Sequence, residues 1–361
     1  MNAKVLEKYL RRSGVNNRLG ADFLCAVVIP ACDELEELPH TLDTLEAALE
    51  RAPRPVAVIV VVNHPEGAPE QPSLDTLKYL ETRKFPNLYT LYVPGITGGV
   101  GRARKLGMDA FVAAHDAETL DDTLIWSLDA DTRVERDYFE TVEAGFAAHP
   151  EAGFCTLNFR HEPGATPELE RAIREYEAYL REYVADLRRA GSPYAFFSIG
   201  SSFAVRGAAY VRAGGMKVRS AGEDFYFLQE CAKCEKFFEL EEVLTHPSAR
   251  LSGRNVFGTG PALRKLLAGE DLNRIAPAAC DALKLLLDAA KNPKNLASPE
   301  NLLAATPPAV GEFLRAARFM ENWARILANT PAEPAARERA FHRWFDGLKT
   351  LRLLHALSEC P

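Results

Sequence analysis

The first half of the chain alternates short apolar runs with segments of helical periodicity. FLCAVVIP at 23–30 and VAVIVVVN at 56–63 are short and rich in Val and Ile, and the segment between them at 37–52 repeats apolar residues at helical spacing. This alternation continues to about residue 160. Strands separated by helices of this length need crossover connections, so the sequence predicts an α/β fold with a mostly parallel sheet that helices cover on both faces.

A polar or Gly-rich cluster follows four of the predicted strands. Parallel sheets bind ligands in the crevice outside the carboxyl ends of their strands. We therefore expect these clusters to face one crevice. They are ACDE at 31–34, NHPEG at 63–67, GITGGVG at 95–101 and DAD at 129–131.

Two carboxylates stand one residue apart in the stretch IWSLDADTRV at 125–134. Residues two apart in an extended segment point to the same side, so Asp129 and Asp131 would repel each other unless something positive lies between them. Carboxylate oxygens suit Mg²⁺ or Mn²⁺, which complete their shell with substrate phosphates. A surface turn, in which Asp is common, is the alternative interpretation.

Five motifs follow one another along the chain: VVIPACDE at 27–34, VGRARKLGMDAF at 100–111, SLDADTRV at 127–134, GSSFAVRGAAYVRAGG at 200–215 and GEDFYF at 222–227. In this order they resemble the motifs of glycosyltransferase family 2, whose members have the GT-A fold. The similarity spans about residues 24–260 and leaves the tail uncovered. The resemblance implies a Rossmann-like, mostly parallel mixed sheet flanked by helices. It also implies a metal-dependent, inverting transfer of a sugar from a nucleotide-diphosphate sugar to a hydroxyl acceptor, and retention of configuration is the alternative that the D-x-D motif alone leaves open.

The resemblance assigns nucleotide binding to residues that follow the first two strands. Asp33 and Glu34 stand where the family contacts the nucleoside, and Pro30 shapes that turn. The chain departs from the family pattern at Cys32, where an aromatic residue is usual, and at Asp33, where Asn is usual. Asn63 stands where relatives carry an Asp that faces the base, so the base is left open. A helix N-terminus capped by 33–34 is the alternative.

Two further segments offer groups for the diphosphate. Gly99 belongs to a Gly-rich stretch before a helix, and Arg104 aligns with the family arginine, so backbone N–H groups and a guanidinium could reach phosphates there. Arg254 lies in SARLSGRNVFGTG at 248–260, a loop that could close over the diphosphate or serve as a linker into the tail.

The catalytic assignments also follow from the resemblance. Asp224 is expected to act as general base on the acceptor hydroxyl, with Glu223 orienting the base or the acceptor. Asp129 and Asp131 are expected to hold Mn²⁺ or Mg²⁺, which would offset the charge on the leaving diphosphate, and His246 is a candidate third ligand. First-turn capping is the alternative for Glu223 and Asp224, and a structural role is the alternative for His246.

Composition narrows the class of protein. A net charge of −7 over 361 residues argues against a nucleic-acid partner, because phosphate-backbone affinity needs clustered Lys and Arg. Seven scattered cysteines fit reduced thiols better than a disulfide framework. The longest apolar runs fall far short of the roughly 20 residues of a membrane span. The amphipathic start lacks a signal core, so a cytoplasmic location is expected.

The domain prediction has three parts: an N-terminal helical segment at 1–23, a GT-A catalytic domain at 24–260, and a C-terminal helical region at 261–361. Within the catalytic domain, 24–135 is the nucleotide-binding half and 136–260 is the acceptor-side half.

The tail repeats aromatic residues, such as Phe319 and Trp323, at helical spacing. We expect these helices to pack against the catalytic domain or a second copy of the chain, with peripheral contact to a membrane surface as the alternative. The acceptor, whether sugar, lipid or small molecule, is left open.

Two rival functions remain. A sugar-1-phosphate nucleotidyltransferase should carry its Gly-rich loop after the first strand, whereas here the loop follows the third. A nucleotide-sugar-binding protein without catalysis should lack the base or the metal pair, whereas Asp224, Asp129 and Asp131 are all present.

Overall fold

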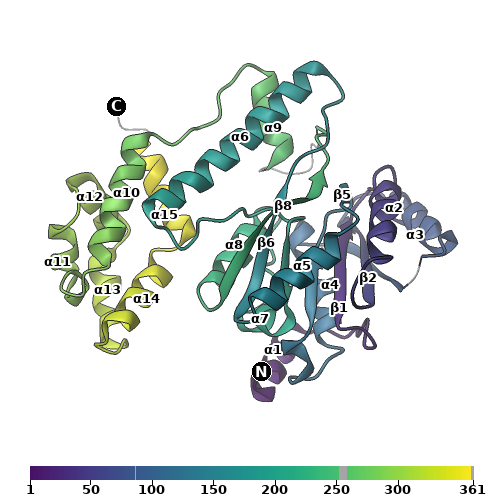
Figure 1. The fold of residues 1–361 in the computed structure, drawn as a ribbon, viewed down its shortest axis with the longest axis horizontal. Coiled ribbons are helices and arrows are strands. Elements are labelled where there is room, and N and C mark those ends of the chain that lie inside the picture. Colours follow the sequence, from purple (N-terminus) through teal and green to yellow (C-terminus); the bar gives the residue numbers. More distant parts are fainter. Residues whose placement is uncertain (86, 252–257, 359–361) are drawn as a thin grey trace. The chain divides into compact units, whose positions relative to one another are not determined.

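The computed structural model describes residues 1–85, 87–251 and 258–358, which form two units. Unit 1 comprises residues 1–176 and 197–270, and unit 2 comprises 177–196 and the chain from 271 onward. Figure 1 shows the ribbon of both. The long helix α6 (Pro167–Ala190) begins in unit 1 and continues into unit 2.

Unit 1 is built around one mixed sheet (Figure 1). Within the described ranges its strand order is β3-β2-β1-β4-β7-β6-β8-β5. The pairs β1–β2, β2–β3, β1–β4 and β6–β8 are parallel, whereas β7 runs antiparallel to β4 and β6, and β5 runs antiparallel to β8. The strands are β1 (Cys25–Ala31), β2 (Val56–Pro65), β3 (Leu88–Ile96), β4 (Leu124–Ser127), β5 (Thr132–Val134), β6 (Ala152–Phe159), β7 (Phe203–Arg206) and β8 (Lys236–Pro247).

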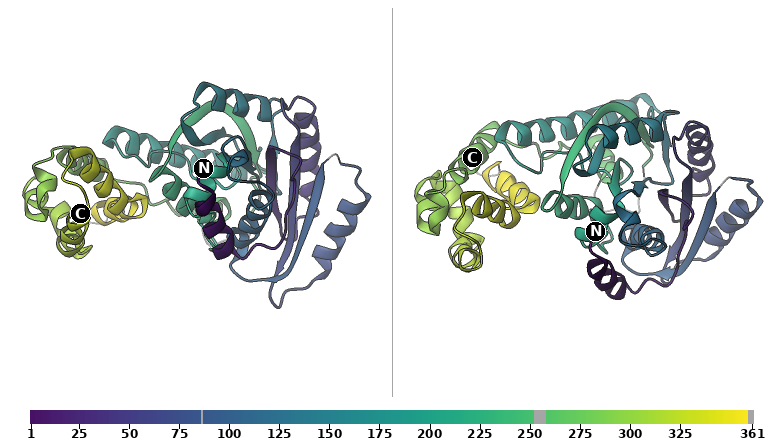
Figure 2. Two further views of the ribbon diagram at one scale, coloured as in Figure 1. Left: turned by 90° about the horizontal axis from the view of Figure 1, so that it is seen from below. Right: turned by 60° about the horizontal axis from the view of Figure 1, so that its bottom comes forward.

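Helices cover both faces of this sheet (Figure 2). Leu42 of α2, Leu80 of α3 and Val142 of α5 share one core with Val27 of β1. Helix α4 packs on the other face, where a Cβ on Gly107 would lie 2.5 Å from a methyl of Val28. The helices of unit 1 besides α6 are α1 (Ala3–Ser13), α2 (Leu38–Leu49), α3 (Gln71–Thr82), α4 (Gly99–Val112), η1 (Thr119–Asp121), α5 (Tyr138–Ala148), α7 (Gly207–Arg212), α8 (Glu223–Ala232) and α9 (Thr259–Leu267).

A buried polar network anchors the N-terminal helix α1 to α4 and α7. The Tyr9 and Tyr210 hydroxyls donate to the same Asp109 oxygen over 2.5 and 2.7 Å, and Lys105 pairs with the other oxygen at 2.8 Å. Burial and the charge of Asp109 raise the pKa of Tyr9 far above its usual range. These bonds fix the position of α4, whose first turns reach the candidate site described below.

Unit 2 has a helical core of its own. Phe319, Trp323, Phe341 and Phe345 are buried together with Leu353, so the aromatic residues of the tail pack against one another. Besides part of α6, the helices are α10 (Pro277–Ala290), η2 (Asn295–Ala297), α11 (Pro299–Ala304), α12 (Pro308–Ala316), α13 (Phe319–Ala328), α14 (Pro334–Trp344) and α15 (Gly347–Ser358).

The α/β class, the mostly parallel mixed sheet and the C-terminal helical region predicted from the sequence are confirmed. Among the described residues, no helix has the length and apolar character needed to cross a bilayer. The six cysteines in those ranges form no disulfide with one another. The domain limits at 23 and 260 stay a prediction beside the division into units.

Candidate active site

Asp129, Ala130 and Asp131, here called the DAD turn, lie just after the carboxyl end of β4 and lead into β5. Leu128 and Ala130 are buried, whereas the side chains of Asp129 and Asp131 are 36% and 24% exposed. Residues 130 and 131 form a turn rather than an extended strand, so the shared direction of the two carboxylates stays a prediction. The N–H of Thr132 donates to the Asp129 carbonyl over 3.2 Å, which closes the turn.

A buried guanidinium lies against the first of these carboxylates. Arg104, on α4, has a side chain only 1% exposed, and its Nη2 lies 2.7 Å from Asp129 Oδ1 and 3.4 Å from Glu223 Oε1. Its Nη1 donates to the Ser127 hydroxyl over 2.6 Å, and that hydroxyl donates to the Gly200 carbonyl over 2.5 Å. A Cβ on Gly200 would lie 2.8 Å from Arg104 Nη2, so a larger residue there would displace the guanidinium.

A second guanidinium lies against the other carboxylate. Arg250, which follows β8, contacts Asp131 Oδ2 through Nε at 3.0 Å and through Nη2 at 2.9 Å. The same Nη2 is 2.6 Å from both carboxylate oxygens of Glu34. Arg250 therefore joins the DAD turn to the segment after β1.

Asp224, the expected base, lies in the first turn of α8 and directly follows Glu223, whose carboxylate contacts Arg104. Burial raises the pKa of Glu223, although the charge of Arg104 acts in the opposite direction. Burial, followed by the charge of Glu223, raises the pKa of Asp224 to about 7 in the protein without ligands. A carboxylate with a pKa near neutrality is suited to accept a proton at neutral pH. Asp224 Oδ1 also accepts the N–H of Phe225 over 2.7 Å, a local first-turn bond, so the capping alternative stays open.

The residues present fit a divalent cation. Five carboxylates share two guanidinium groups here, which leaves an excess of negative charge. The described residues contain no group of three or more His, Cys, Asp or Glu able to hold a metal. Mg²⁺ commonly uses one or two protein carboxylates and takes its remaining ligands from phosphates and water, so two aspartates suffice when a diphosphate binds. The carboxylates are those of Asp129, Asp131, Glu34, Glu223 and Asp224.

His246, the candidate third ligand, has both ring nitrogens within hydrogen-bond distance of protein atoms. Nε2 is 2.8 Å from a carboxylate oxygen of Glu135, and Nδ1 is 3.0 Å from the Arg160 carbonyl. It lies on β8 opposite Arg133 of β5. Its role as a metal ligand stays a prediction.

The Gly-rich start of α4 packs closely against the segment that precedes α8. Gly98 and Gly99 have φ of +90° and +60°, and a Cβ on Gly99 would lie 2.8 Å from the Ser220 Cα. Gly101 donates its N–H to the Arg219 carbonyl over 3.2 Å. This close backbone contact requires the glycines whether or not they contact a phosphate, so the donor role of Gly99 stays a prediction.

The residues expected to bind the nucleotide lie at or just after the carboxyl ends of β1 and β2, with Pro30 inside β1 and Asn63 inside β2. Pairing of β1 with β4 ends at Val28, so Pro30 lies where its missing N–H is tolerated. Asp33 is exposed and has φ of +54°. Asn63 is buried, and its amide donates to the carbonyls of Ala31 and Val61 over 3.2 and 3.0 Å.

The start of α2 bears on the capping alternative for residues 33–34. The N-cap residue Glu37 makes no side-chain capping bond, and the Glu34 backbone carbonyl accepts the N–H groups of Glu37 and Leu38. The Glu34 carboxylate contacts Arg250. Arg254, the remaining predicted donor residue, lies outside the described residues.

The sequence did not single out Ser127 or Gly200 as site residues. It placed Arg250 in the loop at 248–260 that could close over the diphosphate, but did not predict its contact with Asp131. Ser127 stands two residues before Asp129, so the alternation that pairs the aspartates could have revealed it. Gly200 and Arg250 lie far along the chain, and only the folded structure shows that they reach the DAD turn.

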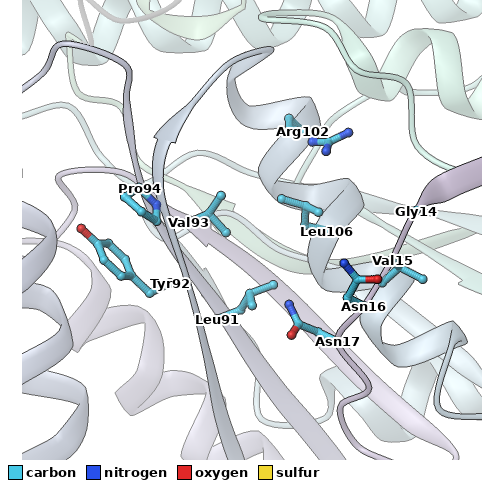
Figure 3. Close-up of a pocket in the computed structure, with 10 residues that line it drawn as sticks. All are labelled: Gly14, Val15, Asn16, Asn17, Leu91, Tyr92, Val93, Pro94, Arg102 and Leu106. Carbon is cyan, nitrogen blue, oxygen red and sulfur yellow. The ribbon is translucent and has the colours of Figure 1, made fainter.

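A separate pocket of about 330 Å³ lies between β3, α4 and the chain after α1 (Figure 3). Leu91, Val93 and Leu106 give it apolar walls, and Asn17 and Arg102 add polar groups. None of the predicted site residues lines it, so it is distinct from the carboxylate cluster.

No family model and no curated protein matches the chain. Among solved structures it is similar to S. aureus TarS 1-349 in complex with UDP-GlcNAc, at 13% identity and a TM-score of 0.47 over 88% of this chain and 91% of that one. It is also similar to the mannosyltransferase PcManGT from Pyrobaculum calidifontis in complex with GDP-Man and Mn²⁺, at 15% identity and a TM-score of 0.43 over 98% and 93% of the chains. A third is glucosyl-3-phosphoglycerate synthase from Mycobacterium tuberculosis with phosphoglyceric acid, at 12% identity and a TM-score of 0.38 over 76% and 87%. The function proposed below rests on the side chains already described.

Replacing Arg104 by Met tests the buried ion pair. The substitution leaves Asp129 and Glu223 without their guanidinium, so we expect the free energy of unfolding to fall by about 3–5 kcal/mol. Urea unfolding followed by circular dichroism measures this change. Arg102→Met, on the same helix but partly exposed, is the matched control and should cost less than about 1 kcal/mol. Equal losses in the two variants would contradict the account.

Replacing Asp224 by Asn tests the raised pKa. A group whose pKa is higher in the folded than in the unfolded protein stabilises the fold at low pH and loses that contribution as pH rises toward about 7. The variant should therefore gain stability relative to wild type between pH 4 and 8, by about 1–2 kcal/mol after allowance for solvent screening. Urea unfolding at several pH values tests this, and a difference that does not change with pH would refute it.

Proposed function

We propose that this protein is a glycosyltransferase that moves a sugar from a nucleotide-diphosphate sugar to a hydroxyl acceptor, with inversion at the anomeric carbon. The observation that carries the proposal is the gathering of Asp129, Asp131, Glu223 and Asp224 around Arg104 and Arg250 at one end of the sheet. Such a site can hold a diphosphate leaving group on one side and a base on the other.

Asp129 and Asp131 are the residues that would hold Mn²⁺ or Mg²⁺ in this proposal. Both side chains are partly exposed, although Arg104 contacts one oxygen of Asp129 and Arg250 contacts one oxygen of Asp131. The metal, when bound, offsets the negative charge of the diphosphate as it leaves. Glu34, which follows β1, and Asn63, near the end of β2, are proposed to lie near the nucleoside.

Asp224 is proposed to take the proton of the acceptor hydroxyl. As that oxygen bonds to the anomeric carbon, the bond from the carbon to the diphosphate oxygen breaks, which inverts the configuration. Glu223 holds the start of α8 against Arg104, and Arg104 also contacts Asp129. One guanidinium thereby fixes the position of the base relative to the residues proposed to bind the donor.

The acceptor is a sugar, lipid or other small molecule with a free hydroxyl group. A contribution of unit 2 to acceptor binding or to assembly with a second copy also belongs to the proposal. A cytoplasmic location of the protein is also part of the proposal.

Calorimetric titration tests the proposal. UDP, GDP, CDP and TDP are titrated with and without Mn²⁺ into wild type and Asp131→Ala. We expect one nucleotide to bind with Mn²⁺, and the substitution to weaken that binding at least about tenfold, because it removes one of two metal ligands. Asp75→Ala, an exposed carboxylate on α3, is the control and should bind like wild type. Nucleotide binding that ignores both Mn²⁺ and Asp131 would contradict the proposal.

A further inference from the structure

Arg250 contacts two carboxylates to which the proposed function gives different tasks. Asp131 is proposed to hold the metal, and Glu34 is proposed to lie near the nucleoside. The guanidinium spans both, at 2.9 Å from Asp131 Oδ2 and 2.6 Å from Glu34 Oε2. The guanidinium of Arg250 therefore already offsets the charge of Asp131, one of the two proposed metal ligands.

The backbone brings Arg250 back to the turn that it contacts. Pro247, at the end of β8, pairs with Thr132 at the start of β5. The N–H of Ser248 then donates to the Asp131 carbonyl over 3.0 Å, and the N–H of Arg250 donates to the Ser248 hydroxyl over 3.3 Å. The segment is thus tied to the DAD turn through its backbone, and the guanidinium could leave Asp131 without any movement of that tie.

The two arginines of the site differ in how firmly they are held. Arg104 is 1% exposed and contacts Asp129, Ser127 and Glu223, so its guanidinium is enclosed on several sides. The Arg250 side chain is 29% exposed. Of the two guanidinium groups, that of Arg250 is therefore the easier one for a bound metal ion to displace from its carboxylate.

We infer that Arg250 competes with the divalent cation for Asp131, and that metal binding releases the guanidinium toward the diphosphate of the donor. Both its Nε and its Nη2 approach Asp131 Oδ2, one of the two oxygens through which Asp131 can bind a metal. A divalent ion at Asp131 would also repel a guanidinium held a few ångströms away. This inference rests on the proposed function and adds a residue that couples metal binding to diphosphate binding.

Titration with Mn²⁺ alone, read by the electron paramagnetic resonance signal of the free ion, tests the competition in the full chain. We expect Arg250→Ala to bind Mn²⁺ about tenfold more tightly than wild type, the size of a typical coupling between two ligands. Arg250→Lys should fall between the two, because it keeps the charge but loses the forked contact. Arg212→Ala removes an arginine that pairs with Glu235 instead, and should match wild type.

A second titration follows the released guanidinium. Inorganic pyrophosphate is added at saturating Mn²⁺, and Arg250→Ala should bind it about tenfold more weakly than wild type. An unchanged pyrophosphate affinity would overturn the second half of the inference. Circular dichroism checks that each variant is folded. If Arg250→Ala does not fold, the Mn²⁺ and pyrophosphate affinities of Arg250→Lys are compared with those of wild type instead.

Asp131→Asn separates the failure of this inference from that of the proposed function. Loss of Mn²⁺ binding in Asp131→Asn with an unchanged Mn²⁺ affinity in Arg250→Ala overturns the competition and leaves the proposed metal site standing. Wild-type Mn²⁺ affinity in Asp131→Asn overturns both. Loss in Asp131→Asn with tighter binding in Arg250→Ala supports both.

Discussion

The buried guanidinium of Arg104 is the interaction on which the candidate site depends. It contacts Asp129 of the DAD turn and Glu223 at the start of α8, and it is almost fully enclosed. Burying a charge is costly unless it is paired, and removing one partner leaves the others uncompensated. The turn after β4 and the helix α8 are therefore held together by an ion pair that the fold cannot easily lose, and the carboxylate beside it, Asp224, has its pKa raised to about 7.

The sheet explains why residues so distant in sequence meet. Strands β1, β2 and β4 are parallel, so the segments that follow them emerge at the same edge. Helix α4 starts near that edge and brings Arg104 to the turn. Strand β8 pairs with β5, which carries Arg250 to the other aspartate. One guanidinium is enclosed and the other partly exposed, so the site combines a fixed ion pair with an exchangeable one.

Part of this arrangement could be predicted from the sequence, because it follows from local periodicity. The alternation of strands and helices predicted the α/β class, which the structure confirms, and the apolar run at 123–128 predicted a strand that leads into Asp129 and Asp131. The partners of the aspartates could not be predicted, since burial of Arg104 and the approach of Arg250 depend on packing between distant segments. The Gly-rich stretch shows the same limit: Gly99 and Gly101 contact the backbone at 217–220, which spacing alone does not reveal.

The central claim is that Asp129 and Asp131 bind a divalent cation together with a nucleoside diphosphate. Crystals of the protein grown with Mn²⁺ and the nucleotide that binds would test it through anomalous scattering measured at the manganese edge. The account predicts an anomalous peak within coordination distance of both carboxylates, with the diphosphate completing the shell. A peak elsewhere, or a bound diphosphate with no peak at these two residues, would contradict it.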